Sequence, residues 1–325
     1  MTAYVVRRLF VIIPSIVVIT MLVSLIIRLL PADAVMVLAA QQGFSQEADL
    51  DRLRHELGLD KPWQEQYWDW FSAIFRSIPE GRLDLGDSLR TRRDIAGELK
   101  TRLPVSLELA GLALLMALAI AIPVGVISAV KRNTWSDYLA RSFAIIGVAI
   151  PGFWLATLVV VWPSVWWRWS PPSVFRPLHH DPIANLSFMW LPALLLSLYF
   201  VGFLMRMTRT MMLEVLTSDF VRTARAKGLR NLAIIVRHAL RNALIPVVTV
   251  IGLQIPVLIG GAVVYETVFS VPGIGRLLIE AAQNRDYPVI QAINLIIAVV
   301  VVFLNLIVDV SYAVLDPRVR LAGGD

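Results

Sequence analysis

The 325-residue sequence contains no cysteine. Disulfide frameworks, thiolate metal sites and cysteine nucleophiles are therefore excluded. Charged residues are also scarce, at 17% of the chain, whereas typical soluble domains have about 25%. Because 57% of the residues are hydrophobic, the chain has too little polar surface for a large soluble domain and lacks the composition of a disordered protein.

Several catalytic and nucleotide-binding signatures are absent as well. No G-x-x-x-x-G-K-[ST] motif occurs, so the chain has no P-loop, and neither H-E-x-x-H nor G-x-S-x-G is present. Of the four histidines, the adjacent pair His179-His180 is expected to be solvated rather than to bind a metal. We therefore predict that the chain is not an enzyme and binds no metal or cofactor itself.

The sequence is instead rich in long apolar runs. A bilayer core about 30 Å thick requires about 20 apolar residues in a helix. Six stretches meet this requirement and predict six transmembrane helices, at 9–30, 103–130, 142–165, 188–205, 243–265 and 288–308. The first run is longer than the apolar part of a signal peptide, so we expect it to be retained. The predicted fold class is an all-α membrane protein.

The positive charges between the predicted spans indicate an orientation. The connections carry 15 Lys and Arg on the side of the two termini and 5 on the other side, once segment 31–102 is set aside. This segment is longer than about 60 residues, and long segments cross the membrane largely regardless of their charge. Both termini are therefore predicted to be cytoplasmic, and segment 31–102 is predicted to be extracytoplasmic.

Segment 31–102 contains an apolar, mostly aromatic helix face. Its members recur at helical spacing and are Trp63, Tyr67, Trp70, Phe71 and Ile74. Such a face suits the lipid headgroup layer and packing against the spans equally well. A cage around a ligand is a third interpretation.

The connection 206–242 is the most informative part of the chain. Thr217-Ser218-Asp219 offers caps for a helix from about Phe220, and Gly228 suits the left-handed position after its end. A second helix runs from there into the fifth span, so it is not a free DNA recognition helix. Its predicted apolar face consists of Leu232, Ile235, Val236, Ala239, Leu240, Ala243 and Leu244. The element is either a basic face on anionic lipid or a knob, kept thin by Ala224 and Ala226, that docks into a soluble partner.

These residues resemble the cytoplasmic EAA loop of ABC-importer permeases, through FVRTARAKG from Phe220 and RHALRNALIP up to Pro246. More narrowly, the chain resembles the oligopeptide/dipeptide/nickel permease family, of the B-subunit type. Further matching motifs are DLGDSL (84–89), PGFW (151–154), ETVFSVPGIG (266–275), RDYP (285–288), Asp309 and DPR (316–318). One departure is Arg222-Thr223-Ala224, where many ABC permeases read Glu-Ala-Ala, and it puts a salt bridge made by that glutamate in doubt.

The resemblance implies the MetI-like core fold of type I ABC importers. The first helix would lie in 1–30, an extracytoplasmic helical insertion in 31–102, the permease core in 103–317 with its coupling loop at 206–242, and a cytoplasmic tail in 318–325. The implied partners are a homologous second permease, two cytoplasmic ATPases that bind ATP and Mg²⁺, and an extracytoplasmic substrate-binding protein. The implied cargo is a peptide, with oligopeptides first and dipeptides second.

The resemblance also implies roles for individual residues. The contact with the ATPases would involve Phe220, Arg222, Thr223, Ala224, Arg225, Ala226, Lys227, Gly228 and Leu229. The outer loop with Pro272, Gly273 and Gly275 would face the binding protein or the partner permease.

Three polar residues of the predicted spans are candidates to line a passage, namely Gln254, Asn294 and Asn305. Hydrogen bonding between helices explains each of them equally well. An ion-coupled secondary transporter is the alternative function, but ionisable residues that would relay ions are absent from the middle of the predicted spans. An ABC permease for nickel or another solute is a further alternative.

Overall fold

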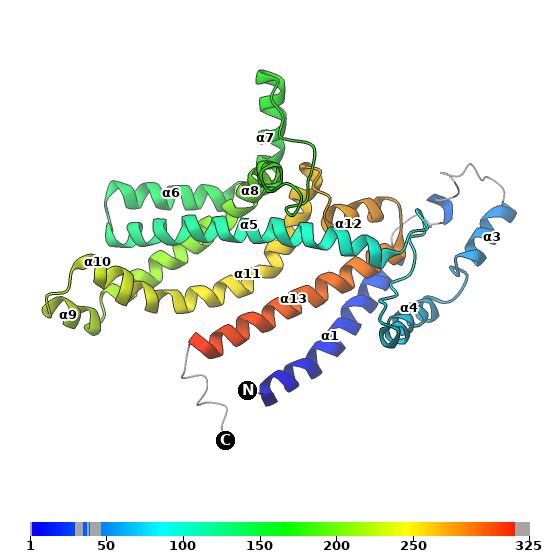
Figure 1. Cartoon of the computed structure of the whole chain (residues 1–325), viewed down its shortest axis with the longest axis horizontal. Helices are drawn as coiled ribbons and strands as arrows, with labels where there is room; N and C mark the ends of the chain where they lie inside the picture. The colour runs from blue at the N-terminus through cyan, green and yellow to red at the C-terminus, as the bar shows by residue number, and fades with distance from the viewer. Residues whose placement is uncertain (1, 30–34, 38, 40–46, 316–325) are drawn as a thin grey trace. The chain divides into compact units, whose positions relative to one another are not determined.

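The computed structural model describes residues 2–29, 35–37, 39 and 47–315, and all the regular elements in these ranges are helical (Figure 1). Two compact units are present: unit 1 comprises Met1–Val105 and Pro272–Val302, and unit 2 comprises Ser106–Val271 and Phe303–Asp325. The elements are α1 (Thr2–Leu29), α3 (Glu47–Glu56), α4 (Trp63–Ser77), η1 (Ile78–Glu80), α5 (Ile95–Val130), α6 (Trp135–Ala149), α7 (Gly152–Trp167), α8 (Pro182–Leu216), α9 (Asp219–Ala226), α10 (Asn231–Ala233), η2 (Ile234–Ala239), α11 (Leu240–Val268), α12 (Ile274–Gln283) and α13 (Tyr287–Leu315).

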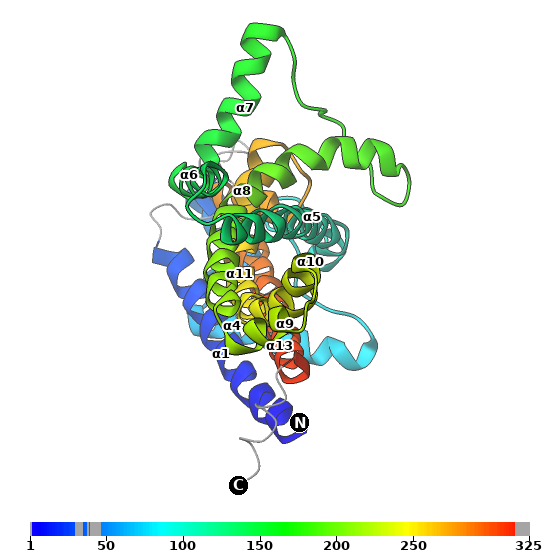
Figure 2. The ribbon, with the colours of Figure 1, turned by 90° about the vertical axis from the view of Figure 1, so that its left-hand side faces the viewer.

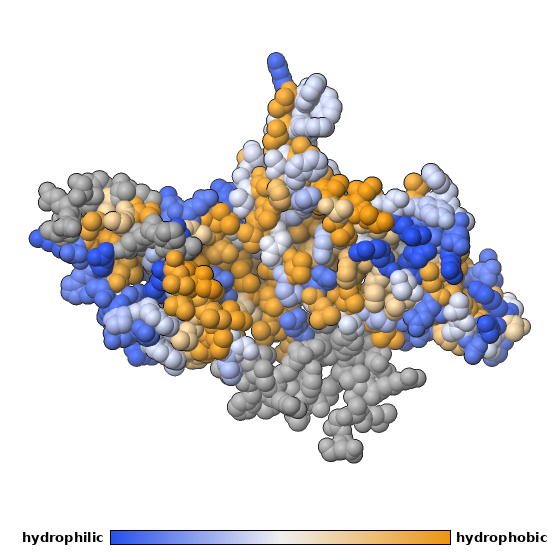
Figure 3. All heavy atoms as spheres, turned by 180° about the vertical axis from the view of Figure 1, so that it is seen from behind, coloured by the Kyte–Doolittle hydropathy of each residue, from blue (hydrophilic) through white to orange (hydrophobic). Residues whose placement is uncertain are grey.

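Among the residues that the structure describes, four helices are long and apolar enough to cross a membrane: α5, α8, the continuous helix Asn231–Val268 and the part Tyr287–Ile307 of α13. They correspond to the second, fourth, fifth and sixth predicted spans. Helix α1 covers the first, and its part Pro14–Leu29 is apolar. Figure 3 shows apolar side chains over much of the exposed helix surface, as expected of residues that face lipid. The chain is an all-α membrane protein.

The third predicted span, 142–165, is not one continuous helix. It is divided between α6 and α7, which are bent by 93° relative to each other (Figure 2). The physical reason is Pro151, because a proline disfavours the helical region for the residue before it. Ile150 accordingly has φ −80° and ψ 125°, which is extended backbone. The expectation of an unbroken span was therefore wrong, and the PGFW motif marks the bend.

Helix α8 is the central helix of unit 2. It has 35 residues, where the sequence predicted a span of 18, and it packs against α6, α7 and α11. Gly202 permits the approach of α6, since a Cβ there would lie 2.6 Å from the carbonyl oxygen of Ala144. Small residues at such crossings let helix backbones come close without a side chain between them.

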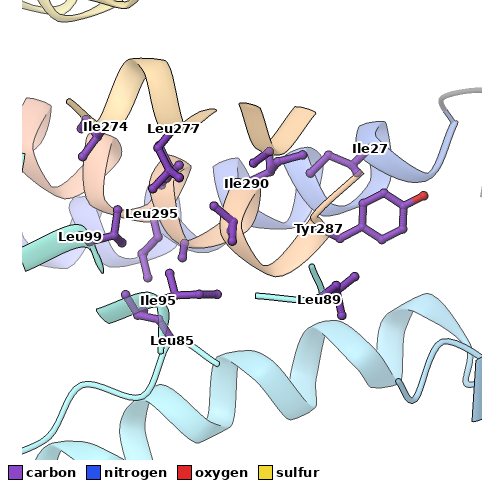
Figure 4. Packing of buried hydrophobic residues seen from close by; sticks show 14 of the residues in the cluster. Ile27, Leu85, Leu89, Ile95, Leu99, Ile274, Leu277, Tyr287, Ile290 and Leu295 are labelled. Carbon is purple, nitrogen blue, oxygen red and sulfur yellow. The ribbon is translucent and has the colours of Figure 1, made fainter. Parts of the chain in front are cut away.

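Unit 1 has a hydrophobic core of its own. Figure 4 shows Ile27 of α1, Leu85 and Leu89 of the segment before α5, and residues of α12 and α13 packed together. Ile95 and Leu99 in the first turns of α5 join the same core. The segment before α5 is thereby held against α12 and α13.

The aromatic face of α4 is used mainly for packing. Tyr67 is buried against α1, where its hydroxyl lies 2.9 Å from the Thr20 hydroxyl and 3.2 Å from the Val17 carbonyl oxygen. Burial raises the pKa of the Tyr67 phenol, so the group stays protonated and able to donate. The indole of Trp70 donates to the carbonyl oxygen of Leu85 at 3.1 Å. Of the interpretations of this face, packing within the chain is the one that these contacts support.

Candidate functional site: the helical knob between α8 and α11

Helix α9 begins at Asp219, one residue before the predicted start. Ser218 precedes it in extended conformation, with φ −70° and ψ 156°, as expected of an N-cap residue. Its hydroxyl donates to the carbonyl oxygen of Val215 at 2.6 Å instead of capping α9. The carboxylate of Asp219 stands in the first turn, where negative charge is favoured by the helix dipole.

The end of α9 is a Schellman motif, which confirms the predicted role of Gly228. The Gly228 N–H donates to the carbonyl oxygen of Arg225 at 2.9 Å, and the Leu229 N–H donates to that of Ala224 at 3.3 Å. Gly228 has φ +76°, a left-handed conformation that glycine adopts without strain. This turn sends the chain back from α9 towards α10.

The outward side of this segment carries both positive charge and apolar surface. Arg222, Thr223, Arg225, Ala226, Lys227 and Gly228 are exposed, together with the large apolar side chains of Phe220 and Leu229. Arg222 pairs with Asp219 of the same helix at 3.4 Å, and both side chains are highly exposed. Exposed pairs of this kind contribute little to stability, so the basic face remains available to a partner.

The inward side of α9 packs on the start of the next helix. Val221 and Ala224, three residues apart on one face, form a buried cluster with Ile234. The expectation that Ala224 thins the surface that enters a partner was therefore wrong, because its side chain faces the chain itself. Ala226 is exposed as expected.

The predicted apolar face of the following helix is broken by a π-helical segment. Ile234–Ala239 is π-helical, which inserts an extra residue and rotates the following side chains by about 100°. Residues before and after this segment therefore do not share one face: Leu232 before it is 71% exposed and Val236 within it is 54% exposed, whereas Ile234, outside the predicted face, is buried. The face was predicted correctly at Ala239 and Ala243, which are buried, and at Ile235 and Leu240, which are partly buried and pack against them.

The knob, defined here as residues 219–239, connects to the spans through a second cluster. Ala239 and Ala243 pack with Met212 of α8 and Ala129 of α5. In Figure 1, α9 and α10 lie at one end of α8 and α11, which run side by side. A displacement of the knob would therefore act on α5, α8 and α11 through packed side chains.

A buried ion pair joins α6 to α8 in the same unit. Asp137 of α6 is fully buried, and its carboxylate accepts from Arg209 of α8 through Nε at 2.8 Å and Nη2 at 2.9 Å. It also accepts from the Ser128 hydroxyl of α5 at 2.6 Å and from the backbone N–H of Asn133 at 3.0 Å. Sequence reasoning missed this pair, because nothing local relates Asp137 to an arginine 72 residues further along the chain.

Two known protein families match parts of this chain. Residues 121–321 match the inner membrane component of binding-protein-dependent transport systems, and residues 1–110 match the N-terminal part of such components. The chain belongs to this permease family. Its members are membrane subunits of ABC transporters, so the chain is a multi-pass membrane transport subunit.

Named relatives align along nearly the whole permease. The dipeptide transport system permease protein DppB of Escherichia coli K12 is 40% identical over 343 aligned residues, covering 98% of this chain and 99% of that protein. A putative peptide transport system permease protein of Brucella abortus is 40% identical over 320 residues, with the same coverage. The di/tripeptide permease DppB of Pseudomonas aeruginosa is 38% identical, also covering 98% and 99%.

A solved structure supports the fold of the permease. The crystal structure of an amino acid ABC transporter with histidines aligns with a TM-score of 0.52 at 12% identity. The alignment covers 67% of this chain and 94% of that one. At this identity the likeness shows the fold alone.

The three pathway candidates of the permease lie in different surroundings. The amide of Asn294, in unit 1, donates to the Ile290 carbonyl oxygen at 2.8 Å, a bond within α13 rather than between helices. Gln254, in unit 2, is half-buried, and its Oε1 atom lacks a hydrogen-bond partner among the described residues. Asn305 is half-buried and also belongs to unit 2. A role in transport stays a prediction for all three.

The outer loop is shorter than the predicted turn over 271–276. Gly273 is the N-cap residue of α12, and Gly275 is buried in its first turn, so only Pro272 and Gly273 of the three candidates precede the helix. The loop after α12 contains Asp286, whose buried carboxylate accepts from the Ser88 hydroxyl at 2.6 Å. Two motifs noted separately in the sequence, DLGDSL and RDYP, therefore meet in unit 1.

The permease shows no metal centre in the described residues, where no three His, Asp or Glu side chains gather. The rings of His179 and His180 lie 4.4 Å apart and are exposed. The DPR motif at 316–318 lies outside the described residues, and Asp309 lies beyond the residues whose side chains are described.

Proposed function

We propose that this permease forms half of the translocation pathway of an ATP-driven importer of short peptides. A homologous second permease supplies the other half, two cytoplasmic ATPases bind ATP and Mg²⁺, and an extracytoplasmic binding protein delivers the peptide. Both termini and the knob lie on the cytoplasmic side. The knob is the contact with an ATPase subunit, and the chain itself catalyses no reaction.

The observation that carries this proposal is the two-sided construction of the knob. Its outer side offers exposed cations and large apolar side chains, a combination found at protein interfaces. Its inner side is tied by Val221, Ala224 and Ile234 to a helix that continues directly into α11. A partner that moves the knob therefore moves a membrane-spanning helix.

The need for a partner follows from the chemistry of the cargo. Transfer of an unpaired amide from water into hydrocarbon costs several kcal/mol, so a peptide requires a cavity that opens alternately to the two sides. Transport against a gradient requires an energy source, and the sequence has no P-loop. ATP must then act through another subunit, and the knob provides the mechanical connection.

Short peptides are proposed as cargo because of the relatives. Two of them are named for dipeptide and for di- and tripeptide transport, and their alignments cover 98% of this chain. The sequence alone put oligopeptides before dipeptides. Competition between labelled dipeptides, tripeptides and pentapeptides for uptake ranks these cargoes directly.

The knob is tested by inverting its charge in the complete transporter. In the variant Arg225→Glu/Lys227→Glu, co-purification of the ATPases and ATP-dependent peptide uptake should both fall at least about tenfold, which corresponds to about 1.4 kcal/mol. The matched control is Lys131→Glu/Arg132→Glu, an exposed basic pair on the same predicted side of the membrane. It should retain both properties within about twofold.

Several outcomes would contradict the proposal. Uptake driven by a proton gradient without any ATPase would identify a secondary transporter, and uptake of nickel without peptide would assign another cargo. If the knob variant lost only its retention on vesicles of anionic lipid and kept the ATPases, the basic face would be a lipid contact instead.

A further inference from the structure

A tight turn in unit 1 carries three exposed arginines. Arg90, Arg92 and Arg93 are exposed, and none of the ion pairs in the described part of the chain includes them. They stand within four consecutive residues of a segment predicted to be extracytoplasmic. On that side the rule of positive charges inside does not account for them.

The backbone of this turn is fixed by hydrogen bonds. The Ser88 N–H donates to the Arg93 carbonyl oxygen and the Arg92 N–H to the Ser88 carbonyl oxygen, both at 3.0 Å. The Thr91 N–H donates to the Ser88 hydroxyl oxygen at 2.9 Å. Arg92 is held at φ +54°, a left-handed conformation that costs a non-glycine residue free energy. The three arginines therefore project from a defined backbone.

The buried carboxylate of Asp286, from another part of the chain, also holds the turn by hydrogen bonds. Besides the Ser88 hydroxyl, Asp286 accepts from the Leu89 N–H at 3.1 Å. Asp286 is buried, so both bonds are shielded from water. Leu85, Leu89 and Ile95 on either side of the turn enter the core of unit 1 (Figure 4).

Two of the three neighbouring acidic residues, Asp84 and Asp94, are engaged with backbone, and the third, Asp87, is exposed and forms no ion pair in the described part of the chain. Asp94 caps α5, accepting from the Ala96 N–H at 3.2 Å and the Gly97 N–H at 2.7 Å. Asp84 accepts from the Gly86 N–H at 2.9 Å. None of these carboxylates forms an ion pair with the arginines, so the guanidinium groups keep their hydrogen-bond donors for a partner outside the chain.

Protein and lipid are the two partners that such charge could meet, and the construction favours a protein. Attraction to anionic lipid requires only charge near the surface and no fixed backbone. Here the backbone positions of the three arginines are fixed. They are held by the buried carboxylate of Asp286, by the left-handed conformation of Arg92 and by the core side chains on either side of the turn. Guanidinium groups on a fixed backbone can form bidentate hydrogen bonds with carboxylates that lie at defined positions on a protein surface.

We propose that the turn 88–93 is a docking site for an acidic patch on the extracytoplasmic binding protein of this transport system. This inference rests on the proposed function for its side of the membrane and its partner. The family description supports such a partner, since the chain is a component of a binding-protein-dependent system. Docked there, the binding protein would be held by charge-assisted hydrogen bonds at the mouth of the permease.

The test measures the affinity of the purified binding protein for the complete transporter in nanodiscs of zwitterionic lipid. In the variant Arg90→Gln/Arg92→Gln/Arg93→Gln, binding should weaken at least about tenfold at low salt, mainly through slower association. The difference should shrink at ~0.15 M salt and above, because screening weakens exposed charge pairs. The matched control Arg76→Gln/Arg82→Gln/Lys100→Gln removes the same charge from exposed positions of unit 1 and should bind within about twofold of the unmodified transporter.

Two further variants separate geometry from charge. Replacement of all three arginines by lysine keeps the charge and should restore part of the affinity but not all of it. Ser88→Ala removes the hydroxyl that donates to Asp286 and leaves the arginines unchanged, and it should weaken binding by several-fold. If Ser88→Ala binds as tightly as the unmodified transporter, the fixed backbone is irrelevant and the proposal is wrong.

The outcomes distinguish this inference from the proposed function. Unchanged affinity of the triple glutamine variant, or an equal loss in the control, would overturn the docking site even where ATP-dependent peptide uptake is intact. Loss of retention on phosphatidylglycerol vesicles with unchanged affinity for the binding protein would assign the turn to lipid. Labelling of Thr91→Cys by an impermeant maleimide in intact spheroplasts should succeed, and protection there would place the turn on the wrong side.

Discussion

At Asp137, one carboxylate organises the ends of three helices. It accepts hydrogen bonds from Arg209 of α8, from Ser128 of α5 and from the backbone N–H of Asn133 before α6. Removing two charges from water is costly, and only such complete pairing offsets the cost. The pair therefore defines how α5, α6 and α8 meet rather than adding much net stability.

Removing one partner of this pair should be strongly destabilising. We expect Asp137→Asn to lower the free energy of unfolding by about 3–5 kcal/mol, because Arg209 is left partly buried without its counter-charge. Thermal denaturation of the detergent-solubilised protein measures the effect as a fall in Tm. Asp69→Asn, which breaks the exposed pair with Lys61, is the control and should leave Tm unchanged.

A double variant checks the cause of this loss. In Asp137→Asn/Arg209→Met neither charge remains, so Tm should recover towards the original value. If the double variant is as unstable as Asp137→Asn alone, the unpaired charge is not the reason, and the hydrogen bonds of the carboxylate to Ser128 and Asn133 carry the stability.

Gly228 is a residue on which the proposed mechanism depends directly. A leucine there would have open space, but at φ +76° it would cost about 1–2 kcal/mol and reorient the chain after α9. We expect Gly228→Leu to abolish peptide uptake at normal membrane levels. Gly228→Asn is the control, since asparagine tolerates the left-handed conformation, and most uptake should remain. Equal uptake in both variants would show that the turn does not orient the knob.

Among the elements, α8 is the one that the others depend on. Its whole apolar stretch is largely enclosed by α6, α7 and α11, whereas the apolar stretches of the other long helices are mostly exposed. The crossing with α6 depends on Gly202, where a Cβ would collide with the backbone of Ala144. A backbone cannot retreat as a flexible side chain would, so this contact has little tolerance for added volume.

A larger residue at this crossing should push α6 away from α8. We expect Gly202→Leu to lower the free energy of unfolding by about 1–3 kcal/mol, the usual cost of overpacking, or by more where the helices separate. Gly260→Leu on α11 is the matched control, because nothing lies within 4 Å of a Cβ built there. Denaturation in detergent compares the two, and equal stability would show that α6 and α8 do not need their close approach.

The elements also show what the sequence could predict. The apolar runs located α1, α5, α8, α11 and α13, because the bilayer imposes length and composition on a span before any packing. Local turn chemistry located the end of α9 at Gly228. The bend at Pro151 was visible in the sequence as a proline, but its angle depends on α8 and α11, which hold the two halves. Periodicity failed at the π segment, since a 3.6-residue repeat assumes a regular helix throughout.

The candidate site was also predictable only in part. Residues 220–229 were identified by their likeness to a family, while their division into an outward and an inward side required the contact of Ala224 with Ile234. The pairing of Asp137 with Arg209 and of Ser88 with Asp286 joins residues 72 and 198 positions apart. Contacts of that separation depend on the fold, so one sequence alone gives no signal for them.

At the scale of the whole molecule, much of the surface consists of apolar side chains that need a partner. Large apolar residues are exposed along α7 in particular, including Trp162, Trp166 and Trp167. Tryptophans near the end of a membrane helix favour the headgroup layer, where the ring is buried and the indole N–H meets water. The end of α7 is thus expected at a membrane surface, and the question is which surface.

The bend between α6 and α7 decides the topology of the entire chain. If the pair crosses the membrane as one broken span, the turn before α6 and the loop after α7 lie on opposite sides. If it is a re-entrant loop, they lie on the same side, and every later segment of the chain is inverted. Six crossings and a cytoplasmic knob require the first arrangement.

Because the chain has no cysteine, single-cysteine variants report this topology without background labelling. Arg132→Cys and Ser173→Cys place one thiol on each side of the bent pair, both at exposed positions. We expect an impermeant maleimide to label Ser173→Cys in intact spheroplasts, and Arg132→Cys and Thr223→Cys only after the membrane is opened. Equal labelling of Arg132→Cys and Ser173→Cys in intact spheroplasts would mean a re-entrant pair, and five crossings would then put the two termini on opposite sides.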